Sequence, residues 1–192
     1  MIKVVGRAER SFVFPAELPI AYAYYGDVAR LLNYLPHISL VRAYGPDRFR
    51  LLYSSTELGA YQIQIFADVQ TTLEGGWELH VHPLSGISPL EPAAGLHSSM
   101  AQGFFASRSF FRDEGEQTHI DYSLELRAKL PTPLGLRFMP GGMINRIASS
   151  ITNSRIRETV EGFVNLSIAA FPHWLDEIRN NHPLPEWYIL RD

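Results

Sequence analysis

The sequence predicts an α+β protein in which a curved antiparallel sheet wraps around one long C-terminal helix. In the last third of the chain, roughly residues 138–180, apolar side chains recur at the spacing of an amphipathic helix. Between residues 38 and 130, polar and apolar side chains mostly alternate with a period of two, which is typical of strands that have one buried face. So long a helix needs a large apolar surface to lie against, and the strands before it supply one.

The composition is that of one globular domain. The chain has 192 residues, 46% of them hydrophobic and 19% charged, and we expect a single domain over 1–192 with an extended tail at 181–192. It contains no cysteine, which excludes disulfides and thiolate metal sites. The net charge of −3 and the scattered arginines argue against a nucleic-acid partner.

The N-terminal sequence and the lengths of the apolar runs indicate where in the cell the protein is expected. No run of 18 apolar residues is present, so we expect no stable membrane insertion. The first residues, which include Lys3 and Arg7, become charged too early for a signal peptide. We therefore expect a cytoplasmic protein. The sequence does not predict the oligomeric state.

The chain begins with a strand and a helix pair. Residues 2–14 are predicted to form the strand, and Pro15 ends it. Residues 16–34 carry apolar side chains at mixed spacings of three and four, which predicts two short helices with a bend at Gly26. Pro36 ends this segment, because the residue before a proline disfavours the helical conformation.

Consecutive hairpins follow the helix pair. Turn residues separate the predicted strands, and tight turns of this kind join neighbouring antiparallel strands. A meander is therefore predicted. The strands are 38–44, 49–56, 61–69 and 77–82, and the turns are Gly45-Pro46-Asp47, Leu58-Gly59 and Gly75-Gly76.

The second half of the chain predicts a long connection, two long strands and the helix. Residues 83–97 are rich in proline and glycine, which predicts an irregular lid or rim. Strands are predicted over 98–112 and 119–129, and the second has the cleanest alternation in the chain. A bent connection leads into the helix, where Pro172 predicts either a kink or a fresh helix start.

This order of elements resembles the helix-grip fold of the START and Bet v 1-like superfamily. Three stretches resemble, more narrowly, an uncharacterised branch of it in cyanobacteria and plastids: FVFP at 12–15, YAYYGD at 22–27 and LLNYLPHI at 31–38. The resemblance implies a sheet that grips the last helix, with an apolar small molecule bound between the two. It supplies no catalytic residue, and we predict neither a metal site nor a cofactor.

The inward faces of the strands and the helix supply the candidate ligand contacts. Small hydroxyl groups on an otherwise apolar face either leave room for a ligand or fill tight places against the helix, and both interpretations stay open. The candidates are Tyr53, Ser55, Tyr61, Ile63, Ile65, Phe105, Ser107, Ser109, Tyr122, Leu124, Ile151 and Arg155.

Arg155 lies close to the apolar stripe of the helix and has two interpretations. If it points under the sheet it needs a partner, and a ligand carboxylate or phosphate would serve. The alternative, which we favour, is a boundary residue with its stem buried and its guanidinium in water.

His80 and His82 share one face of a strand, as two ligands of a metal ion would. The third ligand would have to come from a neighbouring strand, with Asp68 or Gln64 as candidates. The alternating apolar residues of the same strand occupy its buried face, so solvated surface histidines are favoured.

The sequence thus predicts binding or carriage of a hydrophobic small molecule, such as a lipid, an isoprenoid or a pigment, between sheet and helix. Access is expected at 83–97 or at 22–36. One alternative is an enzyme similar to polyketide cyclases or dehydratases, which would use the same cavity. The other is a protein-interaction module with a packed core and an exposed apolar patch near the tail.

Overall fold

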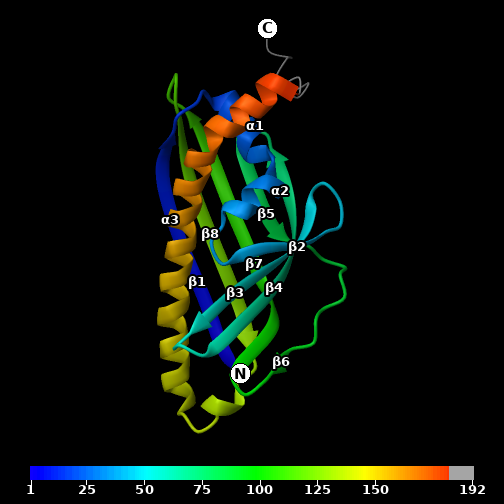
Figure 1. Ribbon diagram of the computed structural model, residues 1–192, viewed down its shortest axis with the longest axis vertical. Coiled ribbons are helices and arrows are strands. Elements are labelled where there is room, and N and C mark those ends of the chain that lie inside the picture. Colours follow the sequence, from blue (N-terminus) through cyan, green and yellow to red (C-terminus); the bar gives the residue numbers. More distant parts are fainter. Residues whose placement is uncertain (182–192) are drawn as a thin grey trace.

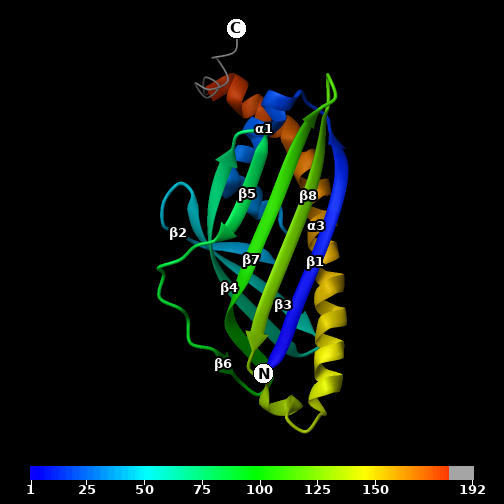
Figure 2. The same ribbon diagram turned by 180° about the vertical axis from the view of Figure 1, so that it is seen from behind.

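The computed structural model describes residues 1–181 (Figures 1 and 2). The predicted tail lies outside the described residues, apart from the backbone of Asn181. A large sheet lays one face against one long helix, which runs along it for most of its length. The predicted α+β fold class is confirmed. Within the described residues, no helix combines the length and the apolar character needed to cross a membrane.

The sheet has eight strands in the order β1-β8-β7-β5-β4-β3-β2, with β6 paired to β7. β1 pairs with β8 along its whole length, so the N-terminal strand lies beside the last strand rather than beside its sequence neighbours. The strands are β1 (Ile2–Phe14), β2 (Ile38–Ala43), β3 (Arg48–Glu57), β4 (Tyr61–Glu74), β5 (Glu78–Pro83), β6 (Ala93–Ala94), β7 (Ser98–Asp113) and β8 (Thr118–Leu130).

The predicted antiparallel meander is confirmed for β2 to β5, and the structure adds one parallel segment that the sequence does not predict. Residues Gln62–Phe66 of β4 pair in parallel with Ser98–Gln102 of β7. The cause is strand length: β5 has 6 residues, whereas β4 has 14 and β7 has 16. Where β5 is absent, its two longer neighbours bond to each other.

Two short helices follow β1, as predicted. α1 spans Leu18–Gly26 with Pro19 in its first turn, and α2 spans Val28–Leu31. Asp27, between the two, accepts a hydrogen bond from the backbone N–H of Arg30 and so caps α2. A short 3-10 turn at Leu32–Tyr34 completes the segment before Pro36.

The long helix α3 spans Gly141–Asn181 without a break. It continues through Pro172, so the fresh helix start considered for that position is wrong. Proline costs a hydrogen bond and clashes with the preceding turn. Phe171 and Trp174 are both buried on either side of it, and their packing holds this turn in place.

Aromatic side chains join the end of β1 and α1 to α3. The ring centroid of Phe14 lies 4.8 Å from that of Phe171, and the ring centroid of Tyr24 lies 5.0 Å from that of Trp174. Tyr24 Oη donates a hydrogen bond to the Ser167 carbonyl at 2.7 Å, and the Tyr25 hydroxyl lies 2.9 Å from Ser167 Oγ. Each buried phenol therefore has a polar partner, and the packing fixes where the helix lies.

This cluster predicts a loss of stability at high pH. Burial raises the pKa of the Tyr24 and Tyr25 hydroxyls above the usual value near 10. Unfolded tyrosines lose protons above about pH 10 while these two keep theirs, so the free energy of unfolding falls as pH rises beyond that value. Chemical denaturation between about pH 8 and pH 11 should show the decline. In the variant Tyr25→Phe the free energy of unfolding should fall less steeply with pH. An unchanged slope would contradict the attribution of the decline to these buried hydroxyls.

The helix packs directly against β1 at Gly6. A Cβ atom built on Gly6 would lie 2.4 Å from Ile156 Cγ1 and 2.9 Å from Thr152 Cγ2. Ile156 is fully buried. Glycine is therefore required at this position by the approach of the helix, and the contact sets the spacing between helix and sheet.

The connection between β5 and β7 is anchored on the outer face of the sheet. The N–H of Leu84 donates to the Asp68 carbonyl, and the N–H of Leu90 donates to Gln102 Oε1. The Asp68 carboxylate is buried there, where Arg50 Nε lies 2.8 Å from its Oδ1. The middle of the predicted lid or rim thus packs away from the face that contacts α3 (Figures 1 and 2).

Candidate functional site

A cavity between the sheet and α3 lies at the end of the molecule where α3 begins, and we call it the basal cavity. It has a volume of about 60 Å³. Strand ends, the connection before α3 and the first turns of the helix contribute its walls. The lining residues are Ile2, Val4, Glu57, Leu58, Tyr61, Gln62, Ile63, Ser99, Leu130, Pro133, Leu136, Met139, Ile144, Ile147, Ala148 and Ile151.

The helix wall of the basal cavity follows from sequence spacing. Ile144, Ile147, Ala148 and Ile151 recur at the spacing that places side chains on one face of a helix, and all four line the cavity. The β1 wall follows from alternation, because Ile2 and Val4 point inward while Lys3 points out. The cavity is thus apolar because a helical pattern and a strand pattern meet there.

The outer wall of the basal cavity is thin. None of residues 134–143 is buried, although Leu136 and Met139 line the cavity. A cavity of about 60 Å³ holds on the order of two water molecules. Drug-sized ligands need roughly 300 Å³ or more, so binding one requires this wall to move.

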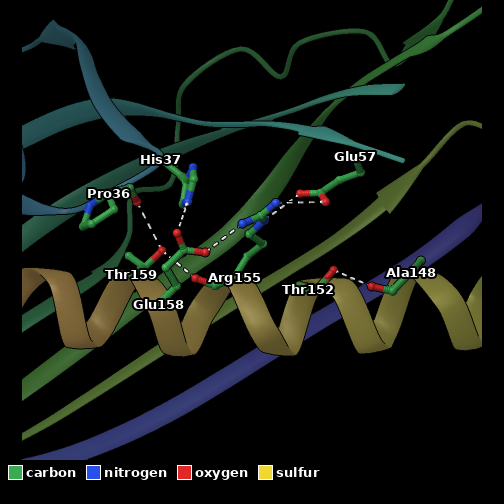
Figure 3. Close-up of polar contacts among 8 residues, drawn as sticks. All are labelled: Pro36, His37, Glu57, Ala148, Thr152, Arg155, Glu158 and Thr159. Carbon is green, nitrogen blue, oxygen red and sulfur yellow. Dashed lines mark hydrogen bonds and ion pairs between the residues drawn. The ribbon is translucent and has the colours of Figure 1, made fainter. Parts of the chain in front are cut away.

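Four side chains form a polar group beside the cavity, and we call it the polar latch: His37, Glu57, Arg155 and Glu158 (Figure 3). Arg155 Nε donates to Glu57 Oε1 at 3.0 Å, and Arg155 Nη1 donates to Glu158 Oε2 at 2.8 Å. His37 Nε2 lies 3.5 Å from Glu158 Oε1. The latch therefore connects α3 to the end of β3 and to the turn before β2.

The electrostatics of the latch follow from these contacts. The Glu57 side chain is 8% exposed and the Arg155 side chain 34% exposed, so the carboxylate is buried and the guanidinium reaches the surface. Hydrogen bonding to Glu57, and then to Glu158, raises the pKa of Arg155. The hydrogen bond from Arg155 lowers the pKa of Glu158. Arg155 and Glu158 are therefore held in their charged forms around neutral pH.

Close packing continues the latch along the helix. Thr159 Oγ1 donates to the Pro36 carbonyl at 3.1 Å (Figure 3). A Cβ atom on Gly162 would lie 2.4 Å from Pro36 Cγ, so the turn at Pro36 rests directly on α3. These contacts leave no gap between α3 and the turn that leads into β2.

A second, smaller cavity lies nearer to α1, and we call it the apical cavity. Its volume is about 30 Å³, room for one water molecule. Burial raises the pKa of Tyr122 in its wall, so this phenol stays protonated around neutral pH. The lining residues are Tyr25, Val28, Leu31, Leu32, Leu35, Leu79, Val81, Phe105, Ser107, Ser109, Tyr122 and Phe163.

The structure divides the candidate contacts predicted from the sequence. Tyr61, Ile63 and Ile151 line the basal cavity. The apical cavity takes Phe105, Ser107, Ser109 and Tyr122. Buried on the sheet, but lining neither cavity, are Tyr53, Ser55, Ile65 and Leu124. Arg155 belongs to the polar latch, so its partners are protein carboxylates.

The sequence analysis did not identify two parts of the site: Glu57 and the connection before α3. The partner of Arg155 lies 98 residues away in the chain, and no local pattern marks it. Leu136 and Met139 stand in a proline- and glycine-rich stretch that has no periodicity. The available signal was the presence of two large apolar side chains in a predicted loop, because apolar residues that gather on an exposed segment indicate a contact or a binding surface.

Among the described residues, the potential metal ligands grouped with His80 are Glu74 and Glu78, and His82 is not one of them. His80 Nε2 lies 2.7 Å from Glu78 Oε2, and its Nδ1 lies 3.7 Å from Glu74 Oε1. Arg108 already occupies the same Glu78 oxygen. Asp68, considered as a third ligand, lies against Arg50 instead, and the residues across from His80 and His82 are Thr72 and Gln70.

Comparison with known proteins shows a shared fold. No protein-family model and no curated protein sequence matches the chain. The structure of TTHA0849 from Thermus thermophilus is similar, with a TM-score of 0.51 and 18% identity over 86% of this chain and 98% of that one. A conserved protein from Geobacillus kaustophilus gives a TM-score of 0.50 and 10% identity over 87% and 95% of the two chains.

A third similar structure is the di-domain ARO/CYC StfQ from the steffimycin biosynthetic pathway. Its TM-score is 0.51 at 13% identity, and the match covers 90% of this chain and 52% of that one, so this chain spans about half of StfQ. Likeness at such identities concerns the fold alone. The helix-grip fold is confirmed, whereas membership of the START and Bet v 1-like superfamily, and of its narrower branch, stays a prediction.

Proposed function

We propose that this helix-grip protein binds a hydrophobic small molecule of the lipid, isoprenoid or pigment class in the basal cavity. The observation that carries the proposal is the cavity itself, which apolar side chains from β1, β4, β8, the connection and α3 surround. Its outer wall contains no buried residue between 134 and 143. An apolar chain that displaced this wall would gain about 0.8 kcal/mol for each methylene group removed from water.

The polar latch limits what the ligand can be. Arg155 is already held by two carboxylates, so an anionic head group would have to break one of these pairs. We therefore expect the apolar part of the ligand in the basal cavity and any polar part at the solvent edge. A cyclase would need a general acid or an orienting group in the cavity, supplied by a tyrosine, a histidine or Arg155. This alternative has less support, because Arg155 is already paired with Glu57 and Glu158.

Native mass spectrometry with organic extraction, on protein from its own source, tests the proposal most directly. We expect a stoichiometric apolar molecule to accompany the folded chain and to appear in the extract. An empty protein that also fails to take up fluorescent lipid probes would contradict the proposal. The interaction module with a packed core would then be the better account of the small cavity volumes.

The variant Ala148→Leu should reduce uptake of a fluorescent fatty acid at least about fivefold. Ala148 lines the basal cavity, and three further carbon atoms would occupy most of its about 60 Å³. The matched control is Ser150→Leu, which adds leucine to the exposed face of the same helix and should leave uptake unchanged. Equal uptake by both variants would place the ligand elsewhere.

A further inference from the structure

Exposed apolar side chains gather at the end of the molecule that holds the basal cavity. Phe138 is 97% exposed and Leu58 is 63% exposed. We call the set the basal rim, and its members are Leu58, Leu96, Leu134, Phe138 and Met143, all exposed. Exposed large apolar residues that cluster, rather than scatter, mark interaction surfaces.

The segments that carry the basal rim are held together. The N–H of Leu134 donates to the Gly95 carbonyl, and the N–H of Gly135 donates to the Leu96 carbonyl, both at 3.1 Å. Leu58 lines the basal cavity together with residues of the connection. The turn after β3, the segment before β7 and the connection into α3 lie at the same end of the molecule in both views (Figures 1 and 2).

Positive charge accompanies the basal rim. Arginines occur along the whole chain, but the acidic residues leave one long gap: from Leu126 to Arg157 there are six basic residues and no acidic one. Lys3 pairs in register with Lys129, and the backbone N–H of Lys3 donates to Asn145, beside Arg146. Four of the basic residues at this end form no ion pair with any other residue of the described part: Lys3, Lys129, Arg137 and Arg146.

We propose that the basal rim docks on an anionic lipid bilayer, with Phe138 among the acyl chains and Arg137 and Arg146 at the level of the phosphates. Unpaired cations around exposed apolar residues match an interface that is apolar inside and negative at its surface. The chain as a whole carries −3, so this positive end would also orient the molecule. A protein partner of standard size needs about 800 Å² of matched surface, which a few side chains on a projecting connection do not offer.

Docking would place the thin wall of the basal cavity against the bilayer. Leu136 and Met139 line the cavity, while Arg137 and Phe138 between them are exposed. An apolar ligand could then pass between bilayer and cavity without crossing water. Only this last step rests on the proposed function, since docking itself requires no ligand.

Co-sedimentation of the full chain with vesicles tests the docking. We expect it to bind vesicles of phosphatidylcholine with roughly 30% phosphatidylglycerol, and to bind pure phosphatidylcholine much more weakly. Phe138→Ser should lower the partition coefficient about tenfold. The double variant Arg137→Gln, Arg146→Gln should lower the partition coefficient about 25-fold on anionic vesicles, at roughly fivefold for each charge. Raising the salt concentration from about 0.05 M to about 0.5 M should also lower the partition coefficient on anionic vesicles.

The control is the double variant Val41→Ser, Arg42→Gln, which removes an exposed apolar side chain and an exposed basic one from β2. It should bind as the unaltered chain does, and all variants should keep the same melting temperature because the altered side chains are exposed. Absence of binding to anionic vesicles, or equal binding by Phe138→Ser, would overturn the proposal. The proposal would also be overturned if the chain self-associated in the absence of vesicles and Phe138→Ser abolished this self-association. The basal rim would then bind a second copy of the chain.

Discussion

Replacing Gly6 by alanine is expected to lower the free energy of unfolding by about 2–3 kcal/mol. The new Cβ would fall 2.4 Å from Ile156 Cγ1, inside any real contact distance, and Ile156 has no exposed surface into which it could move. Either α3 shifts away from β1 or the isoleucine leaves its rotamer, and both loosen the packing. Urea denaturation followed by far-UV circular dichroism measures the change.

The matched control is Gly142→Ala in the first turn of α3. Nothing lies within 4 Å of a Cβ built there, and the residue is exposed and helical. The same substitution should therefore raise the free energy of unfolding by up to about 1 kcal/mol, because alanine favours the helix over glycine. Equal effects at the two positions would show that α3 does not approach β1 as closely as the structure places it.

Gly6 also shows where sequence reasoning stops for the fold. The alternation over 2–14, although only approximate, predicts the strand, since strand formation depends on local periodicity. Neither the pairing of β1 with β8 nor the crossing of α3 at Gly6 can be inferred from local periodicity. Both depend on contacts between distant segments, although a resemblance in element order anticipated the overall arrangement.

The candidate site was less predictable than the fold for a related reason. Alternation identified Ser107, Ser109 and Tyr122 as inward, and the three do line a cavity. Tyr53 and Ile65 are just as inward, yet neighbouring side chains fill the space around them. A cavity is the small difference between the volume enclosed by the backbone and the volume of the packed side chains, and no single residue determines that difference.

Arg155→Met is expected to lower the free energy of unfolding by about 2–4 kcal/mol. Its removal leaves the Glu57 carboxylate buried without its cation, whereas methionine keeps the apolar stem that packs along α3. The value lies below that of a fully buried pair, because one third of the Arg155 side chain is in water and the partner Glu158 is half exposed. The nearby variant Arg157→Met, at an exposed position, should change stability by less than about 0.5 kcal/mol.

A double-mutant cycle separates the ion pair from packing. Glu57→Gln alone should cost about 1–2 kcal/mol, because the neutral amide forms a weaker contact with Arg155. In the chain that carries both Glu57→Gln and Arg155→Met, no charge is left buried, so the loss should be about 1–2 kcal/mol smaller than the sum of the single losses. Additive losses would mean that Glu57 and Arg155 contribute independently, and the latch would then not hold α3 to the end of β3. A measured coupling free energy would be the contribution of the Glu57–Arg155 pair to holding α3 against β3. A ligand whose binding separates α3 from β3 would have to offset that free energy.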